Sequence, residues 1–337
     1  MISTFSSDSA NGAWQQAADL FRAGDTFVGH DSRVGKTFEL LHAAFSISNP
    51  RQRWVVTRTP ALNPAFAIAE VVWIMKGRED EAFLTYWNRQ LHNFAGEGPK
   101  FYGAYGHRLR RNFGIDQIGR AFEILSNCPN TRQLVLQIWD PTRDLPDATG
   151  IPRAEDIPCN ITSLVKLREG RLEWLQVLRS NDFFLGIPHN FVQFTYLQEI
   201  LAGWLGVELG SYNQISDSLH VYTRDIDHIH GSSAFETKSN TDNLALPKLV
   251  SDECFDEMER RIELFITEGL SEKDHRQMLH WTTAPEGFKN MLSILSAEAA
   301  RRRGWSELAL ESMSLNSNPA LVQLWNRWVA RMRDNST

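Results

Sequence analysis

The chain has 337 residues, of which 42% are hydrophobic, and this is enough for one large domain with an appendage. Its net charge of −6 at pH 7 disfavours direct nucleic-acid binding, which needs an excess of Lys and Arg on one face. Three cysteines without CxxC spacing predict neither a disulfide framework nor a metal site. There is no secretion signal and no apolar run near the ~20 residues that span a bilayer, so we expect a cytoplasmic protein without membrane contact.

Apolar periodicity predicts the elements of the first half of the chain. In order they are a helix over Gly12–Arg22, strands over Phe38–Ile47 and Arg53–Thr59, and helices over Pro64–Met75, Glu79–Leu91 and Ile115–Leu125. Asn63 is placed to cap the helix that begins at Pro64, because its side-chain oxygen can accept from a free N–H of the first turn.

The second half predicts strands followed by helices. Gln133–Trp139 reads as a buried strand, and the long loop Asp140–Pro158 is of a kind that is usually functional or mobile. The strands Ile161–Arg168 and Arg171–Leu178 form a hairpin, which places Cys159 at a strand entrance. The remaining elements are a helix over Asn190–Leu205, a strand over Tyr212–Tyr222, and helices over Asp252–Glu268, Ser271–His280, Pro285–Arg302 and Pro319–Met332. We therefore predict a catalytic domain over residues 1–245 and a helical extension over 246–337.

Three residue types near the hairpin suit a nucleotide site with covalent catalysis. Cys159 supplies a thiol nucleophile, although a lone cysteine is more often a small buried hydrophobe. Arg179 and Ser180 match phosphate geometry with a guanidinium fork and a hydroxyl. Asn190 carries an amide with one donor side and one acceptor side, which can read the edge of a base.

Four short strings in this order and spacing resemble the thymidylate synthase and pyrimidine hydroxymethylase family. They are Pro158-Cys159, Arg179-Ser180-Asn181-Asp182, Gly186-x-Pro188-x-Asn190 and His220-Val221-Tyr222, within a resemblance that runs from about Asp31 to His228. The resemblance implies an α/β (α+β) fold, with a mixed sheet that packs against the sheet of a second subunit to form a homodimer. Here that fold is followed by the helical extension.

The resemblance also implies the chemistry. In this family a cysteine thiolate adds to carbon 6 of a pyrimidine nucleoside monophosphate, and carbon 5 then attacks the co-substrate 5,10-methylenetetrahydrofolate. Cys159 is the implied nucleophile, and the positive charge of Arg179 lowers the pKa of its thiol. Glu70 is the implied general acid and base. Tyr105 resembles the tyrosine that helps to remove the carbon-5 proton, with core packing as the alternative.

Substrate-binding roles follow from the same resemblance. Arg33, Arg179 and Ser180 align with phosphate-binding residues. Arg132 aligns with the first of two arginines that reach across the dimer, but Gln133 replaces the second, which leaves room for a different phosphate or sugar.

The base and the sugar are assigned in the same way. Asn190 aligns with the residue that binds O4 and N3 of uracil, although a flipped amide also fits cytosine. His220 and Tyr222 align with the residues that hold the sugar 3′-hydroxyl. Asp182 aligns with the residue that meets the folate pterin.

Two departures from thymidylate synthases favour hydroxymethylation of dUMP. The segment Leu91–Gly96 has no tryptophan to stack on folate, so Phe94 is the remaining aromatic candidate, and the chain ends in Arg333-Asp334-Asn335-Ser336-Thr337 without the apolar tail that closes those sites. A less sealed site lets water attack where hydride otherwise would. Thymidylate synthesis, with reductive methylation, and hydroxymethylation of dCMP or CMP remain alternatives.

Two other classes compete with a one-carbon transferase. Gly35-Lys36-Thr37 resembles the end of a P-loop, but the glycine spacing is wrong and a strand rather than a helix is expected to follow. A catalytically inactive nucleotide-binding regulator is the more serious alternative, because a fold can persist without its chemistry. His228 and His230 have a metal-like spacing but lack companion ligands, so we expect a solvated turn and no metal.

Overall fold

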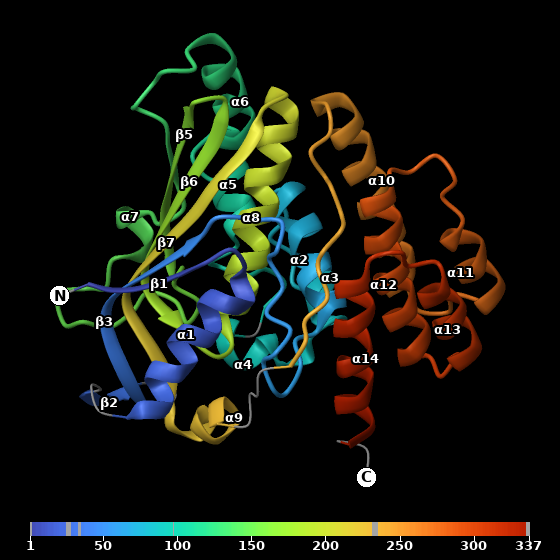
Figure 1. The fold of residues 1–337 in the computed structure, drawn as a ribbon, viewed down its shortest axis with the longest axis horizontal. Coiled ribbons are helices and arrows are strands. Elements are labelled where there is room, and N and C mark those ends of the chain that lie inside the picture. The colour runs from blue at the N-terminus through green and yellow to red at the C-terminus, as the bar shows by residue number, and fades with distance from the viewer. Residues whose placement is uncertain (1, 25–27, 33–34, 97, 231–234, 335–337) are drawn as a thin grey trace.

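The computed structural model describes residues 2–24, 28–32, 35–96, 98–230 and 235–334. Figure 1 shows a twisted sheet, a layer of helices against one of its faces, and further helices from the C-terminal part of the chain beyond that layer. The predicted phosphate ligand Arg33 lies outside the described residues.

Among the described residues, seven strands form one mixed sheet, which confirms the predicted fold class. The strand order is β1-β3-β7-β6-β5-β4, and β2 pairs with β3. The β1–β3 and β6–β7 pairs are parallel and the others are antiparallel. The strands are β1 (Ser3–Ser7), β2 (Val28–Ser32), β3 (Gly35–Ile47), β4 (Val135–Gln137), β5 (Asn160–Arg168), β6 (Arg171–Asp182) and β7 (Glu208–Tyr222).

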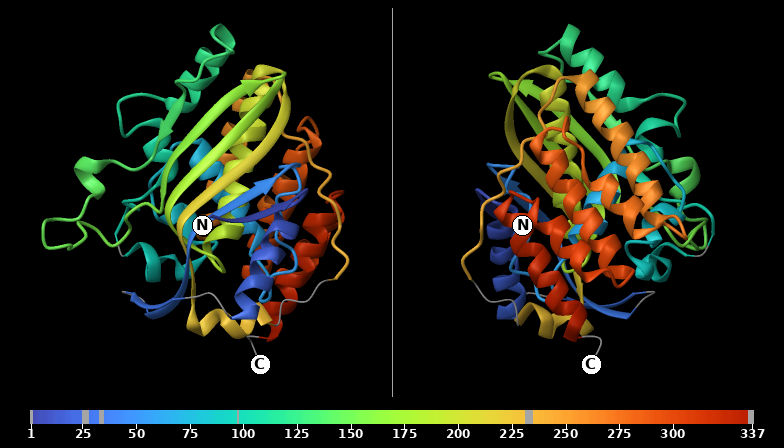
Figure 2. Two further views of the ribbon diagram at one scale, coloured as in Figure 1. Left: turned by 60° about the vertical axis from the view of Figure 1, so that its left-hand side comes forward. Right: turned by 90° about the vertical axis from the view of Figure 1, so that its right-hand side faces the viewer.

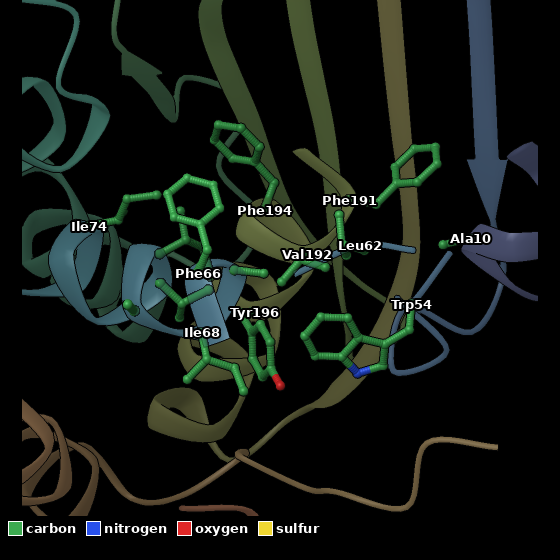
Figure 3. Close-up of a cluster of buried hydrophobic side chains, with 14 of the residues drawn as sticks. Ala10, Trp54, Leu62, Phe66, Ile68, Ile74, Phe191, Val192, Phe194 and Tyr196 are labelled. Atoms are coloured by element: carbon green, nitrogen blue, oxygen red, sulfur yellow. The ribbon is translucent and has the colours of Figure 1, made fainter. Parts of the chain in front are cut away.

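Helix α8 (Gly186–Leu205) covers the sheet, and α2 (Pro64–Met75) packs on α8. Figure 3 shows Phe66 and Ile68 of α2 close to Phe194 and Tyr196 of α8. Both helices are apolar almost all round, as expected for helices with neighbours on every side. In α2 every residue is buried except Glu70.

The other helices before residue 245 are short or lie at the edges of the sheet. They are α1 (Ala10–Ala23), α3 (Ala82–Thr85), η1 (Arg89–Leu91), α4 (His92–Ala95), α5 (Tyr105–Arg110), α6 (Gln117–Asn127), α7 (Pro141–Asp144), η2 (Thr223–Asp225) and α9 (Ile226–His230). Helix α7 lies inside the predicted loop Asp140–Pro158.

The C-terminal helices lie on the side of α2 away from the sheet, as the right-hand view of Figure 2 shows, and are α10 (Lys248–Ile266), α11 (Glu272–Leu279), α12 (Glu286–Arg302), α13 (Ser306–Ser314) and α14 (Pro319–Asp334). Helices α10, α12 and α14 pack on α2, and their buried side chains share one cluster with the sheet and α8. Helices α11 and α13 pack on α12, where Leu279, Ala300 and Leu308 form a second, small cluster. The boundary predicted at residue 245 stays a prediction.

Two predicted elements are wrong. Arg53–Thr59 is not a strand, because its polar groups bind side chains of α1 and α8 and not a neighbouring strand. Asn11 Oδ1 accepts a hydrogen bond from Thr57 N at 2.9 Å, and Glu199 forms an ion pair with Arg53. Glu79–Leu91 is not one helix, because its first residues bond to the segment before α5. There Glu81 N donates to Pro99 O, and Phe101 N donates to Glu79 O.

Several short elements were not predicted, among them β1, β2, α5 and α13. Of the helices described, none is both long and apolar enough to cross a bilayer.

Candidate active site

Cys159 lies directly before β5, at the end of the sheet where the last residues of β6, Arg179–Asp182, also lie. Arg179 N donates to Cys159 O at 3.0 Å. The Arg179 guanidinium donates to Pro158 O and Ile157 O, both at 2.9 Å. This arginine therefore holds the backbone that carries the thiol.

Two opposing effects act on the thiol. Burial is the larger and raises the pKa of Cys159 above its ordinary value, while the charge of Arg179 lowers it. The predicted influence of Arg179 is thus present but smaller than the desolvation. Nearby Asp156 and Asp182 also raise the pKa of the thiol. The surroundings of Cys159 therefore favour the protonated thiol.

Glu70 and His189 form a partly buried polar pair between α2 and α8. Glu70 Oε2 lies 3.8 Å from His189 Nδ1, and neither atom has a hydrogen-bond partner among the described residues. Burial raises the pKa of Glu70 to about 7. Burial, aided by the charge of Arg58, lowers the pKa of His189 to about 3. Glu70 can therefore gain or lose a proton near neutral pH, as a general acid and base must.

Tyr105, the first residue of α5, lies among the same groups. Burial raises the pKa of its hydroxyl, and the nearby Cys159 adds to that shift. Asn160 bonds to the hydroxyl and opposes the shift. The fold therefore brings together Glu70 of α2, Tyr105 of α5 and Cys159, which directly precedes β5.

The predicted sugar and folate ligands lie on neighbouring strands. Ser180 Oγ is 3.4 Å from His220 Nδ1, and the His220 ring lies edge-on to Tyr222 with centroids 5.4 Å apart. Asp182 Oδ1 accepts from Phe184 N at 2.7 Å and Leu185 N at 2.8 Å. Burial raises the pKa of Asp182, and the neighbouring His220 lowers it.

The base-reading candidate Asn190 is held between two other amides. Its Nδ2 donates to Asn181 Oδ1 at 3.0 Å, and its Oδ1 accepts from Asn160 Nδ2 at 3.4 Å. Each of these bonds uses only half of the capacity of the atom concerned, so one N–H and one lone pair remain for a ligand. Sequence reasoning missed both flanking amides, although Asn160 is adjacent to Cys159 and Asn181 lies within the Arg179–Asp182 string.

A cavity of about 850 Å³ opens beside His189, between α8 and the C-terminal helices. Its wall includes Trp87, Arg58 and Leu185, with Trp328 and Arg331 from α14. Cys159 is not among the lining residues. No local sequence pattern indicates these contributions, because they come from segments far apart in the chain. The side chain of Phe94, the predicted aromatic of the folate site, lies outside the described residues.

Two predicted phosphate ligands lie elsewhere. Arg132 and Gln133 are exposed before β4, and β4 runs antiparallel to β5 with Val135 opposite Leu164. Arg132 therefore lies near the end of β5 remote from Cys159, and no contact among the described residues joins it to Arg179. Within one subunit it does not reach the Cys159 cluster.

Metal ligands do not gather in the described part of the chain: no group of three His, Cys, Asp or Glu side chains is placed to hold an ion. His228 belongs to α9 rather than to a turn, and its ring stacks on Phe184 with centroids 5.7 Å apart.

Comparison with known proteins agrees with this geometry. The chain is 35% identical over 231 residues to a deoxyuridylate hydroxymethyltransferase of Bacillus phage SP01, covering 63% of this chain and 58% of the relative. A protein of the same name from Pseudomonas phage M6 is 32% identical over 198 residues, covering 58% and 55%. A thymidylate synthase of Listeria monocytogenes is 30% identical over 174 residues, covering 51% and 49%.

The chain thus spans about half the length of these curated relatives. The family model for thymidylate synthase matches residues 26–269, which include every predicted site residue. The chain therefore belongs to the thymidylate synthase family.

Proposed function

We propose that the protein hydroxymethylates dUMP at carbon 5, with 5,10-methylenetetrahydrofolate as the one-carbon donor. The observation that carries this proposal is the convergence of Cys159, Tyr105 and Glu70 on one buried site, beside an amide with free hydrogen-bonding capacity at Asn190. A regulator that only binds nucleotides has no need for a thiol and a carboxyl group whose pKa is near 7 in one site.

Each side chain then has a role. Cys159 adds to carbon 6, which makes carbon 5 nucleophilic toward the methylene carbon of the folate. Glu70 moves protons at the carbonyl of the base, and Tyr105 hydrogen-bonds the acceptor of the carbon-5 proton. Water then adds to the exocyclic methylene and Cys159 leaves, so the products are 5-hydroxymethyl-dUMP and tetrahydrofolate.

The nucleotide ligands follow from the same site. We assign the phosphate to Arg179 and Ser180, together with Arg33. We assign the sugar 3′-hydroxyl to His220 and Tyr222. Arg132 contributes from a second subunit, because its own subunit holds it at the far end of β5.

The cavity beside His189 suits a folate. Tyr86 supplies aromatic surface for a heteroaromatic ring, and Arg58 and Arg331 supply cations for a carboxylate. Asp182, three residues before the N-cap residue Leu185 of α8, is the pterin contact in this proposal.

Hydroxymethylation is preferred to methylation because this cavity has a polar wall. His189 borders it with 19% of its side chain exposed, and Arg58 and Arg331 also line it. Polar groups of this kind retain water, which is the reactant that separates the two outcomes. The names of the phage relatives point the same way.

A homodimer is part of the proposal. The sheet face opposite α8, seen in the left view of Figure 2, presents the half-exposed apolar side chains of Leu164, Leu175, Val177 and Ile215 in adjacent rows. Such a patch fits a partner surface of the same kind. We place the protein in the cytoplasm, where a free thiol stays reduced.

The test is mass spectrometry of the products after incubation with dUMP and methylenetetrahydrofolate, with dCMP and CMP in parallel. We expect a gain of one hydroxymethyl group on dUMP and none with Cys159→Ser. A methyl group with dihydrofolate establishes a thymidylate synthase instead. Nucleotide binding without turnover in either form establishes the regulator.

A further inference from the structure

A chain of hydrogen bonds leads from the Asn190 amide back into the sheet. Asn160 Oδ1 accepts from Gln176 Nε2 at 2.9 Å, and Gln176 Oε1 accepts from Trp174 Nε1 at 3.2 Å. On the other side of Asn190, Asn181 Nδ2 donates to Ser216 Oγ at 3.1 Å. We call this set the amide relay; its members are Trp174, Gln176, Asn160, Asn190, Asn181 and Ser216, all of which are buried.

The hydrogen bonds of the relay run in one direction, and among the residues that the structure describes a single member determines that direction. An amide can be turned over so that its oxygen and nitrogen exchange places, and a hydroxyl can donate or accept. The hydroxyl neighbours of the relay, which are Ser163 at Gln176, Tyr105 at Asn160 and Ser216 at Asn181, therefore permit either direction. The indole N–H of Trp174 can only donate.

The donor at Trp174 determines every amide in turn. Because Gln176 must present its oxygen to the indole, its nitrogen faces Asn160. Asn160 must then present its nitrogen to Asn190, and Asn190 its nitrogen to Asn181. Turning any one amide alone sets two N–H groups or two oxygens against each other in a buried site, which is costly.

Local backbone features bring the relay together. The pairing of β5 with β6 shifts between Asn160 and Thr162, so Asn160 lies opposite Leu178 while Thr162 lies opposite Val177. This bulge turns Asn160 to the face that carries Gln176. Gly186 leaves the space that Asn181 occupies, because a Cβ there would lie 2.9 Å from Asn181 Oδ1.

We propose that Trp174 determines the choice of pyrimidine, by fixing through Gln176 and Asn160 which end of the Asn190 amide meets each position of the base. Trp174 and Gln176 are thus specificity residues that act through Asn190 and do not contact substrate. The proposal rests on the proposed function, in which Asn190 reads the base.

The chemistry of the two bases makes this direction matter. Uracil offers an acceptor at O4 and a donor at N3–H, whereas cytosine offers a donor at N4 and an acceptor at N3. A fixed amide complements one of these pairs and opposes the other at both positions. A relay free to reverse admits both bases.

The experiment compares Trp174→Phe and Gln176→Met with Trp54→Phe. The first removes the indole donor, and the second interrupts the relay but leaves the indole. Trp54 is the matched control, since it is buried to the same degree, also contacts one aromatic ring, and its Nε1 has no partner among the described residues. Calorimetry measures the dissociation constants of dUMP and dCMP, and thermal unfolding checks that each variant is folded.

We expect the ratio of the two dissociation constants to move toward one by roughly tenfold or more in Trp174→Phe and in Gln176→Met. Trp54→Phe should keep the wild-type ratio. The proposal is overturned if both relay variants fold and keep the wild-type ratio, if the control loses discrimination equally, or if the wild type binds neither nucleotide.

Binding needs neither folate nor turnover, so this outcome is separate from that of the product assay. If the wild type yields no product but the preference between dUMP and dCMP weakens in the relay variants, the amide relay is supported and the proposed enzymatic function is refuted. If the wild type prefers dCMP and the relay variants weaken that preference, the amide relay is supported and the proposed substrate changes from dUMP to dCMP.

Discussion

Glu70 Oε2 lies 3.8 Å from His189 Nδ1, and burial shifts the pKa values of the two side chains in opposite directions. The carboxyl of Glu70 keeps its proton up to a pH of about 7 because its pKa is raised, and His189 stays neutral down to about pH 3 because its pKa is lowered. Over that interval the pair is neutral, and this is how two ionisable groups are tolerated between apolar helices. Above it Glu70 becomes an unpaired anion.

Glu70 should therefore make the fold less stable as the pH rises. The folded state holds the proton between the ordinary pKa of 4.5 and about 7 while the unfolded state releases it, so stability is lost across that window. Relative to Glu70→Gln, the wild type should lose on the order of 3 kcal/mol between pH 4.5 and pH 8. Urea unfolding of both proteins across this range measures the difference; parallel curves contradict the raised pKa.

His189 should act on the acid side. Its folded pKa is depressed from 6.5 to about 3, so its contribution is present above pH 6.5 and is lost as the pH falls toward 3. Relative to His189→Gln, the wild type should lose about 2 kcal/mol between pH 7 and pH 5, since only the unfolded chain takes up the proton there. Urea midpoints at each pH test this, and NMR titration of the imidazole should detect no protonation above pH 5.

At the scale of elements, sequence reasoning succeeds where local signals decide. Helix α2 has the predicted bounds, with Asn63 as its cap and Pro64 as its first residue, because the cap and the apolar run lie within one stretch. It fails at Arg53–Thr59, where the residues favour a strand but Thr57 hydrogen-bonds to Asn11 and Arg53 forms an ion pair with Glu199. Those partners are distant in sequence, and no local pattern indicates them.

The same reasoning explains the site. Motif strings identified Cys159, Arg179 and Asn190, which the fold brings to one end of the sheet. The amide relay was not predictable, because it depends on a bulge in β5 and on which side of β6 Gln176 faces. The cavity was not predictable either, because α14 forms part of its wall.

The cap of α2 allows a test at this scale. Asn63 Oδ1 accepts from Phe66 N at 3.1 Å, and its Nδ2 donates to Trp87 O at 2.9 Å. Asn63→Ala loses both bonds and should cost roughly 2 kcal/mol, whereas Asn63→Asp keeps the cap and should cost about half as much. Ser271→Ala, at the exposed cap of α11, is the control and should cost about 1 kcal/mol. Equal unfolding midpoints for the two Asn63 variants contradict the second bond.

At the scale of the molecule, the proposed dimer supplies what one subunit lacks. If Arg132 acts across the interface, Arg132→Ala and Cys159→Ser should each lower turnover strongly. For Cys159→Ser, which removes the nucleophile, we expect a loss of roughly a thousandfold or more. Subunits of the two variants that are unfolded together and refolded should regain activity, because one site of the mixed dimer has both Cys159 and a partner's arginine. Sedimentation checks the dimer, and refolding without recovery contradicts the shared site.

A buried carboxylate joins two of the C-terminal helices, and one of its partners reaches the rest of the chain. Glu298 of α12 is fully buried and accepts bonds from Arg301 and Arg302 at 2.8 Å and from Trp328 of α14 at 3.1 Å. Arg302 also donates to Trp87 O at 2.7 Å, which connects the cluster to the wall of the cavity. The helices therefore act as a second layer of the same core.

Removing this carboxylate tests whether the molecule unfolds as one unit. Glu298→Ala leaves two partly buried guanidinium groups and an indole N–H without their acceptor, and should cost about 3–5 kcal/mol. Because α10, α12 and α14 share the main cluster of buried side chains with the sheet, tryptophan fluorescence and circular dichroism should report one shared transition at a lower urea midpoint. The dependence of the unfolding free energy on urea concentration should be unchanged. Glu298→Gln, which keeps acceptor oxygen but no charge, should lie between the variant and the wild type. Two separate transitions in the wild type would instead establish residues 246–337 as an independent domain.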